Sequence, residues 1–121
     1  MKLKQILAAA ALTLATSAWA DMPAKPQDGV LIGAKDMTLY TLDKDTAGAS
    51  TCNGPCAANW PPLMADEGAM ASGDWSVVTR DDGKKQWAYK GKPLYYFVKD
   101  QKPGDRTGEG MLNNMWHVAK P

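Results

Sequence analysis

Apolar residues occupy five successive positions, 94–98, of the segment 94–99, which reads Leu-Tyr-Tyr-Phe-Val-Lys. In an extended chain alternate side chains point to opposite faces, so Tyr95 and Phe97 share one face. Tyr96 and Val98 lie on the other, and both faces are therefore apolar. This pattern predicts a central strand that is covered on each side by the rest of the domain.

Shorter apolar runs bounded by turn residues predict the other strands. The Asp82-Gly83 step is a strong hairpin signal, because Asp-Gly favours the tight turns that join antiparallel strands. A second hairpin is expected in the first half of the chain. These further strands comprise residues 30–32, 37–42, 75–80, 85–89 and 115–119. No convincing helical periodicity follows residue 20, so the predicted fold is all-β, a small antiparallel sheet or sandwich.

A seven-residue motif, Leu-Tyr followed by three residues and Lys-Asp, occurs twice in the chain, at 39–45 and at 94–100. A long loop follows each copy and closes on a tryptophan, Trp60 in the first case and Trp116 in the second. The sequence therefore predicts two tandem repeats, each built of strand, long loop and tryptophan. Their expected extents are about 30–63 and 75–121.

The first 20 residues have the pattern of an export signal. Lys2 and Lys4 precede the apolar run 6–15, and Ala18-Trp19-Ala20 has the small residues of a cleavage site. A run of ten residues is too short for a bilayer core, which needs roughly 20. We therefore expect cleavage after Ala20, a flexible arm at 21–28, one β domain at 29–121, and a periplasmic or secreted protein without a transmembrane segment.

The charge of the chain is nearly balanced. The sequence holds 14 basic and 13 acidic residues, and two of the lysines belong to the expected signal. The mature chain thus carries a net charge near −1, which gives no reason to expect nucleic acid or an anionic membrane as a partner.

Two cysteines, Cys52 and Cys56, flank an Asn-Gly-Pro turn signal in the first long loop. A nearby pair in an exported protein usually becomes a disulfide, so we expect these two residues to be bridged. An alternative uses them with His117 as a copper or redox site, because thiolates and imidazole suit soft ions such as Cu(I). If the two cysteines form a structural disulfide, no cofactor or metal is expected.

The repeated motif also supplies candidate ligand-binding side chains. Each aspartate stands where a strand gives way to a loop, so its carboxylate is expected to accept backbone N–H bonds in the turn. A functional alternative is that the tyrosines and aspartates form two equivalent polar sites for a ligand. Tryptophans exposed at the surface are a further candidate for ligand contact. With the lone histidine, these candidates are Tyr40, Asp45, Trp60, Tyr95, Asp100, Trp116 and His117.

Motifs of known hydrolases and phosphate-binding enzymes are absent from the sequence. With one histidine and no nucleophile motif, catalysis is not the favoured hypothesis. We expect a non-catalytic binding or envelope-accessory protein with an unknown envelope or small-molecule ligand. An enzyme of unrecognised type remains a further alternative.

Taken together, the motifs resemble the secreted-repeat family, also described as predicted lipoproteins with a Tyr-x4-Asp motif. The resemblance covers nearly the whole mature chain and implies an extracytoplasmic tandem-repeat domain of unassigned biochemical role. No cysteine near the cleavage site could accept a lipid, which departs from the lipoprotein description. The residues that carry the resemblance are the two Leu-Tyr-x-x-x-Lys-Asp motifs, Cys52–Cys56 with Trp60-Pro61-Pro62, Asp82-Gly83 with Trp87, 91–97, Gly104-Asp105 with Gly108, and Trp116-His117.

Overall fold

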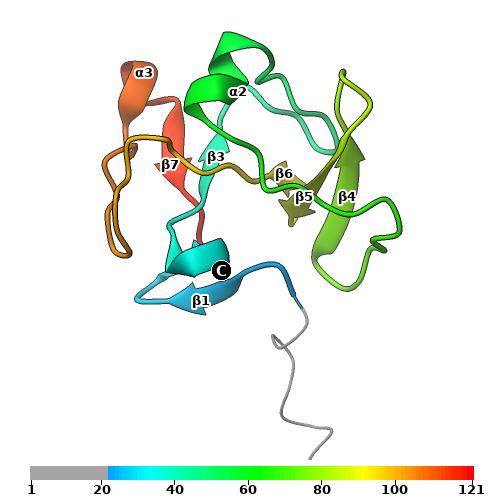
Figure 1. The fold of residues 1–121 in the computed structure, drawn as a ribbon, viewed down its shortest axis with the longest axis horizontal. Helices are drawn as coiled ribbons and strands as arrows, with labels where there is room; N and C mark the ends of the chain where they lie inside the picture. The colour runs from blue at the N-terminus through cyan, green and yellow to red at the C-terminus, as the bar shows by residue number, and fades with distance from the viewer. Residues whose placement is uncertain (1–21) are drawn as a thin grey trace, which may run out of the picture.

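A computed structural model describes residues 22–121 of the protein, so the expected signal at 1–20 lies outside the described residues. Figure 1 shows three small sheets around a loop-rich centre. No helix in the described part has the length and apolar character needed to cross a membrane. The elements are β1 (Lys25–Gln27), β2 (Val30–Ile32), η1 (Ala34–Asp36), β3 (Tyr40–Leu42), α2 (Pro55–Asn59), β4 (Trp75–Thr79), β5 (Lys85–Tyr89), β6 (Lys92–Pro93), α3 (Met111–Asn114) and β7 (Trp116–Val118).

All strand pairs among these residues are antiparallel, which confirms the predicted all-β class. One sheet joins β1 to β2, a second joins β3 to β7, and a third has the order β4-β5-β6. The hairpin predicted from Asp82-Gly83 is confirmed, with Val77 opposite Trp87. The sheets are small because each strand has at most five residues.

The N-terminal part differs from the expectation. Residues 25–27, assigned from the sequence to a flexible arm, form β1 and pair with β2 around the Asp28-Gly29 turn. Gly29 has φ of +83°, a conformation that glycine adopts without steric cost. The hairpin expected between 30–32 and 37–42 is reduced to a bridge between Ile32 and Thr38, because β3 pairs with β7 instead.

The predicted continuous strand at 94–99 is wrong. Tyr95 makes only isolated bridges, to Tyr40 and to Pro62. The physical reason lies in the facing segment 60–63, whose two prolines have no N–H and cannot complete a ladder. The chain turns directly after Phe97, so Val98, expected on a buried face, is 54% exposed.

The two predicted repeats are intertwined. Strand β3 of the first repeat pairs with β7 of the second. In matching fashion, the segment after β6 pairs with the end of the first repeat, since Leu63 donates its amide to the Leu94 carbonyl at 2.9 Å. The corresponding bond on the other side joins Ala119 to Leu39 at 2.8 Å. Each repeat therefore supplies its last strand to the other.

Buried side chains form two clusters. The second lies around the two repeat tryptophans. The first gathers Ala24, Leu31, Leu39, Leu63, Trp75, Tyr89, Leu94 and Ala119. The long loops contain short helices that the sequence did not predict, α2 in the first and α3 in the second. The second cluster lies where the motifs of the two repeats meet.

Candidate functional site

The motif tyrosines and aspartates pair across the repeats. Tyr40 donates its hydroxyl to Asp100 at 2.6 Å, and Tyr95 donates to Asp45 at 2.6 Å. Both tyrosines are fully buried, and Asp100 is 8% exposed. Burial, and after it the bond to the aspartate, raises the pKa of each tyrosine far above its usual value. The hydroxyls therefore remain protonated donors.

A threonine completes each aspartate's hydrogen bonds. Thr51 donates its amide to Asp45 at 2.8 Å and its hydroxyl at 2.7 Å. Thr107 donates the same two groups to Asp100, the amide at 3.0 Å. The carboxylates thus accept backbone N–H bonds in the turns, as the residue type favours. A ligand-binding role for these four motif residues stays a prediction.

The repeat tryptophans stack in the core. The rings of Trp60 and Trp116 are parallel to within 2°, with centroids 3.8 Å apart. Trp60 is 3% exposed and Trp116 is fully buried, so neither forms a surface platform for a ligand. Phe97 stacks on the other side of Trp60 with centroids 4.1 Å apart. Gly108 lies so close to Trp60 that an added Cβ would meet its ring at 2.6 Å.

A buried arginine ties the disulfide loop to β4 and β5. Arg80 is 4% exposed and donates to Ser50 at 3.0 Å, to Gln86 at 2.8 Å and to the Cys52 carbonyl at 2.7 Å. The predicted disulfide between Cys52 and Cys56 is present. Sequence reasoning missed Arg80, because an arginine next to a hairpin turn usually extends into water.

His117 does not join the cysteines in one site. Its Nδ1 lies 3.1 Å from Glu109 and its Nε2 lies 3.1 Å from Asp43. The bond to Glu109, followed by that to Asp43, raises the pKa of His117. Among the described residues no group of three or more His, Cys, Asp or Glu could hold a metal ion. The copper hypothesis stays a prediction that would require reduction of the disulfide.

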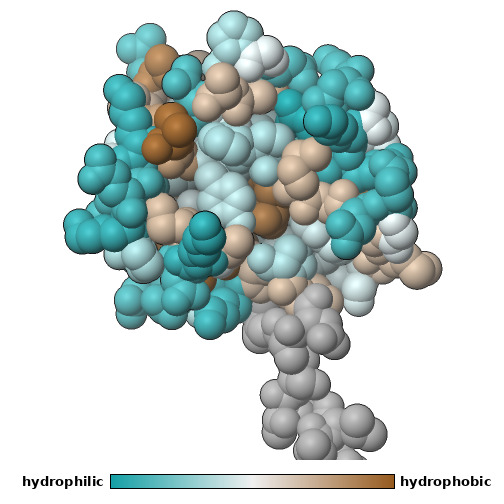
Figure 2. All heavy atoms as spheres, viewed as in Figure 1, coloured by the Kyte–Doolittle hydropathy of each residue, from teal (hydrophilic) through white to brown (hydrophobic). Residues whose placement is uncertain are grey.

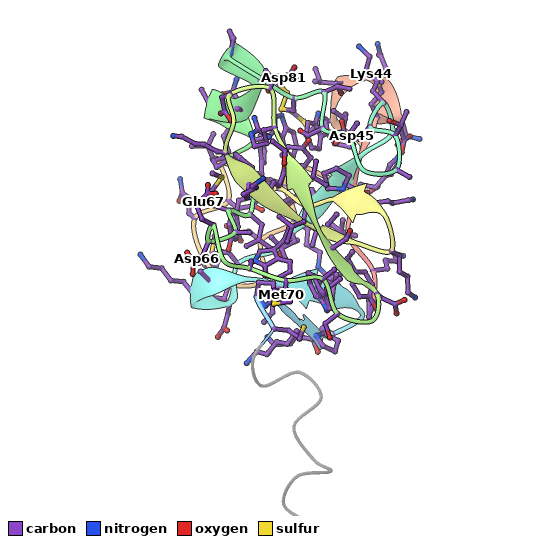
Figure 3. The ribbon with its side chains drawn as sticks, turned by 90° about the vertical axis from the view of Figure 1, so that its right-hand side faces the viewer. Lys44, Asp45, Asp66, Glu67, Met70 and Asp81 are labelled. Carbon is purple, nitrogen blue, oxygen red and sulfur yellow. A yellow bond between two sulfur atoms is a disulfide. The ribbon has the colours of Figure 1, made fainter. Side chains whose placement is uncertain are left out.

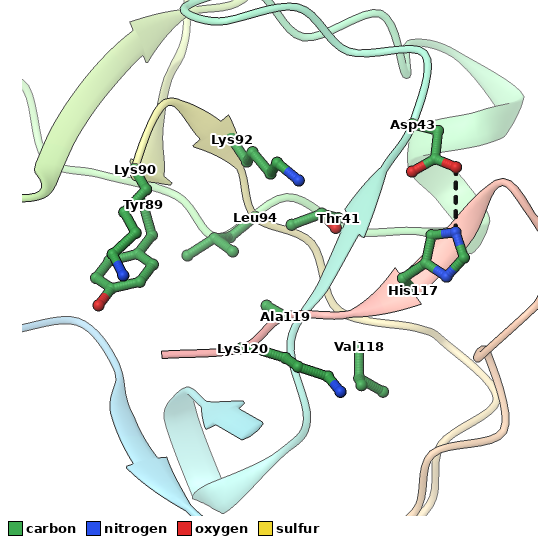
Figure 4. Close-up of a pocket in the computed structure, with 10 residues that line it drawn as sticks. All are labelled: Thr41, Asp43, Tyr89, Lys90, Lys92, Leu94, His117, Val118, Ala119 and Lys120. Atoms are coloured by element: carbon green, nitrogen blue, oxygen red, sulfur yellow. Dashed lines mark hydrogen bonds and ion pairs between the residues drawn. The ribbon is translucent and has the colours of Figure 1, made fainter. Parts of the chain in front are cut away.

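A hollow of about 420 Å³ opens between β7, β3 and the turn joining β5 to β6. We call it the lysine hollow. Figure 4 shows Tyr89 and Lys90 at one end and His117 with Asp43 at the other, while Lys92 and Lys120 extend from opposite sides. Its lining comprises Thr41, Asp43, Tyr89, Lys90, Lys92, Leu94, His117, Val118, Ala119 and Lys120.

The lysine hollow combines an apolar floor with a rim that holds three lysines and one carboxylate, Asp43. Leu94 and Ala119 are buried there, whereas the three lysines are exposed. Within residues 22–121 no ion pair involves any of these lysines. Lys90 lies 5.3 Å from the centroid of the Tyr89 ring. The hollow can therefore contact an apolar group while its rim attracts an anion.

Comparison with known families accounts for the internal duplication. A family described as a secreted repeat of unknown function matches the chain twice, over residues 22–64 and 76–120. The chain belongs to this secreted-repeat family. No curated protein and no solved structure matches the chain. Each matched range contains one copy of the repeated motif, at 39–45 or at 94–100, and the structure shows how the two repeats bond to each other.

The second secreted repeat has a larger residue at the motif position that Thr41 holds in the first. Thr41 follows the motif tyrosine in the first repeat, and Tyr96 follows it in the second. Tyr96 packs against Gly33, where an added Cβ would lie 2.5 Å from its hydroxyl, and accepts the Ala34 amide at 2.8 Å. The larger side chain packs against Gly33 and Ala34, whereas Thr41 lines the lysine hollow.

The lysines of the hollow were not singled out from the sequence. Lys90 and Lys92 lie in a turn and Lys120 near the C-terminus, positions where lysine is commonplace. One available signal was the difference between Thr41 and Tyr96 at matched positions of the two secreted repeats. That difference indicates a site only when the structure is known, because the paired repeats bring the three lysines and Thr41 to the same hollow.

Proposed function

We propose that this protein is an exported, non-catalytic binding or envelope-accessory protein, and that the lysine hollow binds a small organic anion with an apolar or aromatic body. The signal at 1–20 directs the chain out of the cytoplasm. Cleavage after Ala20 then releases the mature protein into the periplasm or beyond the cell. The family description as secreted supports this location.

One observation carries the proposal: Lys90, Lys92 and Lys120 surround an apolar floor and have no ion pair within the described residues. The three lysines outnumber the one carboxylate of the lining, Asp43, which is bonded to His117, so the hollow has an excess of positive charge that favours an anion. Apolar contact with the floor adds about 25 cal/mol for each Å² removed from water. Ligand sites commonly combine such apolar walls with a few charged groups.

The arrangement of His117 favours binding over catalysis. Both ring nitrogens are already bonded, one to Glu109 and one to Asp43. A general acid or base must be within hydrogen-bond reach of the proton it transfers. His117 therefore acts as a fixed wall of the hollow, and it holds the second long loop against β7.

Isothermal titration with phenyl phosphate tests the proposal. Phenyl phosphate offers both an aromatic body and an anionic group, inorganic phosphate offers only the charge, and benzyl alcohol offers only the ring. We expect phenyl phosphate to bind more tightly than either. Replacing Lys90, Lys92 and Lys120 by glutamine should weaken its binding at least about tenfold, because each lost charge contact contributes on the order of 1 kcal/mol.

The matched control is Lys84→Gln. Lys84 is exposed and does not line the hollow, so its replacement removes charge without touching the site. Equal weakening by this variant would show that net charge alone is responsible. Absence of binding by all three probes, or unchanged binding by the triple variant, would contradict the proposal.

A further inference from the structure

A second surface, at α3, exposes apolar side chains to solvent, whereas in the lysine hollow the apolar floor is buried and the lysines are exposed. Val98 is 54% exposed, Met111 is 37% exposed and Leu112 is 60% exposed. Figure 2 shows hydrophobic surface on the side where Figure 1 places α3, with hydrophilic atoms around it. Contiguous exposed apolar side chains in a small protein usually mark a contact surface.

Two hollows flank α3. The first, of about 690 Å³, is lined by Phe97, Val98, Lys99, Gln101, Thr107 and Met111. The second, of about 400 Å³, includes Leu42, Lys44, Thr51 and Leu112. We call the two hollows with α3 between them the α3 surface.

The two hollows are counterparts from the two repeats. Leu42 and Phe97 hold the same position in the repeated motif, two residues after the tyrosine, and Lys44 and Lys99 hold the position before the aspartate. Each hollow also includes the threonine that is bonded to that aspartate. The same combination of apolar wall and lysine thus occurs twice on one side of the molecule.

The backbone of α3 keeps an apolar side chain exposed. Leu112 has φ of 55° and ψ of 61°, a left-handed conformation that residues with a Cβ rarely adopt. Such conformations cluster at binding and switch sites. The Met111 amide donates to the Gly108 carbonyl, and the Met115 amide donates to the Met111 carbonyl. The Val98 amide is likewise bonded, to the Asn59 carbonyl, so the surface offers few backbone groups for an added peptide strand.

We infer that the α3 surface docks on an anionic lipid surface. Aliphatic side chains that extend from a loop enter the interface between headgroups and acyl chains without needing hydrogen-bond partners. Lys44 and Lys99 flank them, and no ion pair within residues 22–121 involves either lysine. Each lysine near an anionic bilayer adds attraction. The net charge near −1 does not predict this contact, whereas the local charge of the α3 surface does.

Sedimentation with lipid vesicles tests the inference. The purified protein is mixed with vesicles of phosphatidylcholine alone or of phosphatidylcholine with phosphatidylglycerol. We expect it to sediment with the mixed vesicles and much less with the neutral ones. The variant Val98→Ser/Leu112→Ser should bind the mixed vesicles at least about tenfold more weakly, and Lys44→Gln/Lys99→Gln about tenfold more weakly.

Two controls separate docking from general effects. Met70→Ser removes a large apolar side chain that is 79% exposed, more than any other among residues 22–121, and Figure 3 shows Met70 well below Lys44 in the view. Its binding should equal that of the wild type, and thermal melts of all variants should confirm folding. The glutamine variant of Lys90, Lys92 and Lys120 should still sediment, which separates this inference from the lysine hollow.

Failure of the folded wild type to sediment with the mixed vesicles would overturn the inference and point to a protein partner for the α3 surface. Equal binding to neutral vesicles would also overturn the inference, because the α3 surface would then not select anionic lipid. Unchanged binding by Val98→Ser/Leu112→Ser would overturn it as well, because another part of the surface would then make the contact.

Discussion

Tyr40 and Tyr95 hold the same position in the two repeats and exchange both backbone hydrogen bonds. The Tyr40 amide donates to the Tyr95 carbonyl at 2.7 Å, and the return bond is 3.0 Å long. From this meeting point each hydroxyl reaches the aspartate of the other repeat, Asp100 or Asp45. The Tyr-x4-Asp motif therefore joins the two repeats, since its tyrosine and aspartate bond between copies rather than within one.

Removing either motif hydroxyl should destabilise the protein. Tyr40→Phe leaves Asp100 without one buried donor, and Tyr95→Phe does the same to Asp45. A hydrogen bond to a charged group contributes about 1.5–3 kcal/mol, so each variant should lose that much free energy of unfolding. Urea denaturation measures the loss.

Tyr96→Phe is the matched control for these two variants. The Tyr96 hydroxyl accepts a bond from the exposed Ala34 amide, which water can satisfy after the substitution. The loss should be smaller than for Tyr40→Phe or Tyr95→Phe. An equally large loss of unfolding free energy for Tyr96→Phe would show that the hydrogen bonds between the repeats contribute no more to stability than an exposed one.

Close packing at Gly108 gives a second prediction. An added Cβ would lie 2.6 Å and 2.8 Å from two ring atoms of Trp60, and the ring is held by the stack with Trp116. Gly108→Ala should therefore cost about 1–3 kcal/mol of unfolding free energy through overpacking. Gly68→Ala is the control, because its Cβ would meet nothing within 4 Å. Similar unfolding midpoints for the two variants would mean that the core around Trp60 yields easily.

The pH dependence of stability should depend on His117, the one histidine in the sequence. Its pKa is raised above the usual 6.5, first by Glu109 and then by Asp43, so its stabilising contribution is lost as pH rises through the raised pKa. The Val118 amide, followed by His117, lowers the pKa of Glu109 from 4.5, so that contribution is lost as pH falls through the lowered value.

Between these two limits both contributions are present. The thermal midpoint should therefore be highest in mildly acidic solution, at about pH 6, and should fall towards about pH 8 as His117 loses its proton. His117→Asn should flatten this fall. A fall of the same size in the variant would assign the pH dependence to other groups.

The sequence predicted those parts of the fold that depend on local chemistry. The Asp82-Gly83 hairpin formed as expected, because the turn signal and both strands are contiguous. The segment 94–99 did not form a strand, because its partner contains Pro61 and Pro62. That effect depends on which segments face each other, which strand alternation alone does not specify.

The candidate site was less predictable for a related reason. The sequence cannot decide whether Tyr40 bonds to Asp45 of its own motif or to Asp100 of the other, since both repeats offer the same groups. The lysine hollow depends on that exchange, because it brings β7 against β3 beside Lys92. The consequence of a threonine at position 41 is visible only after the repeats are paired.

The titration of phenyl phosphate into Thr41→Tyr tests the central claim most directly. Thr41 lines the lysine hollow, and the substitution gives the first repeat the larger residue that the second has at the matched position, Tyr96. We predict that the variant folds but binds at least about tenfold more weakly than the wild type, while the exposed control Thr79→Tyr binds normally. Unchanged binding by folded Thr41→Tyr would contradict the account, because the anion would then bind outside the hollow.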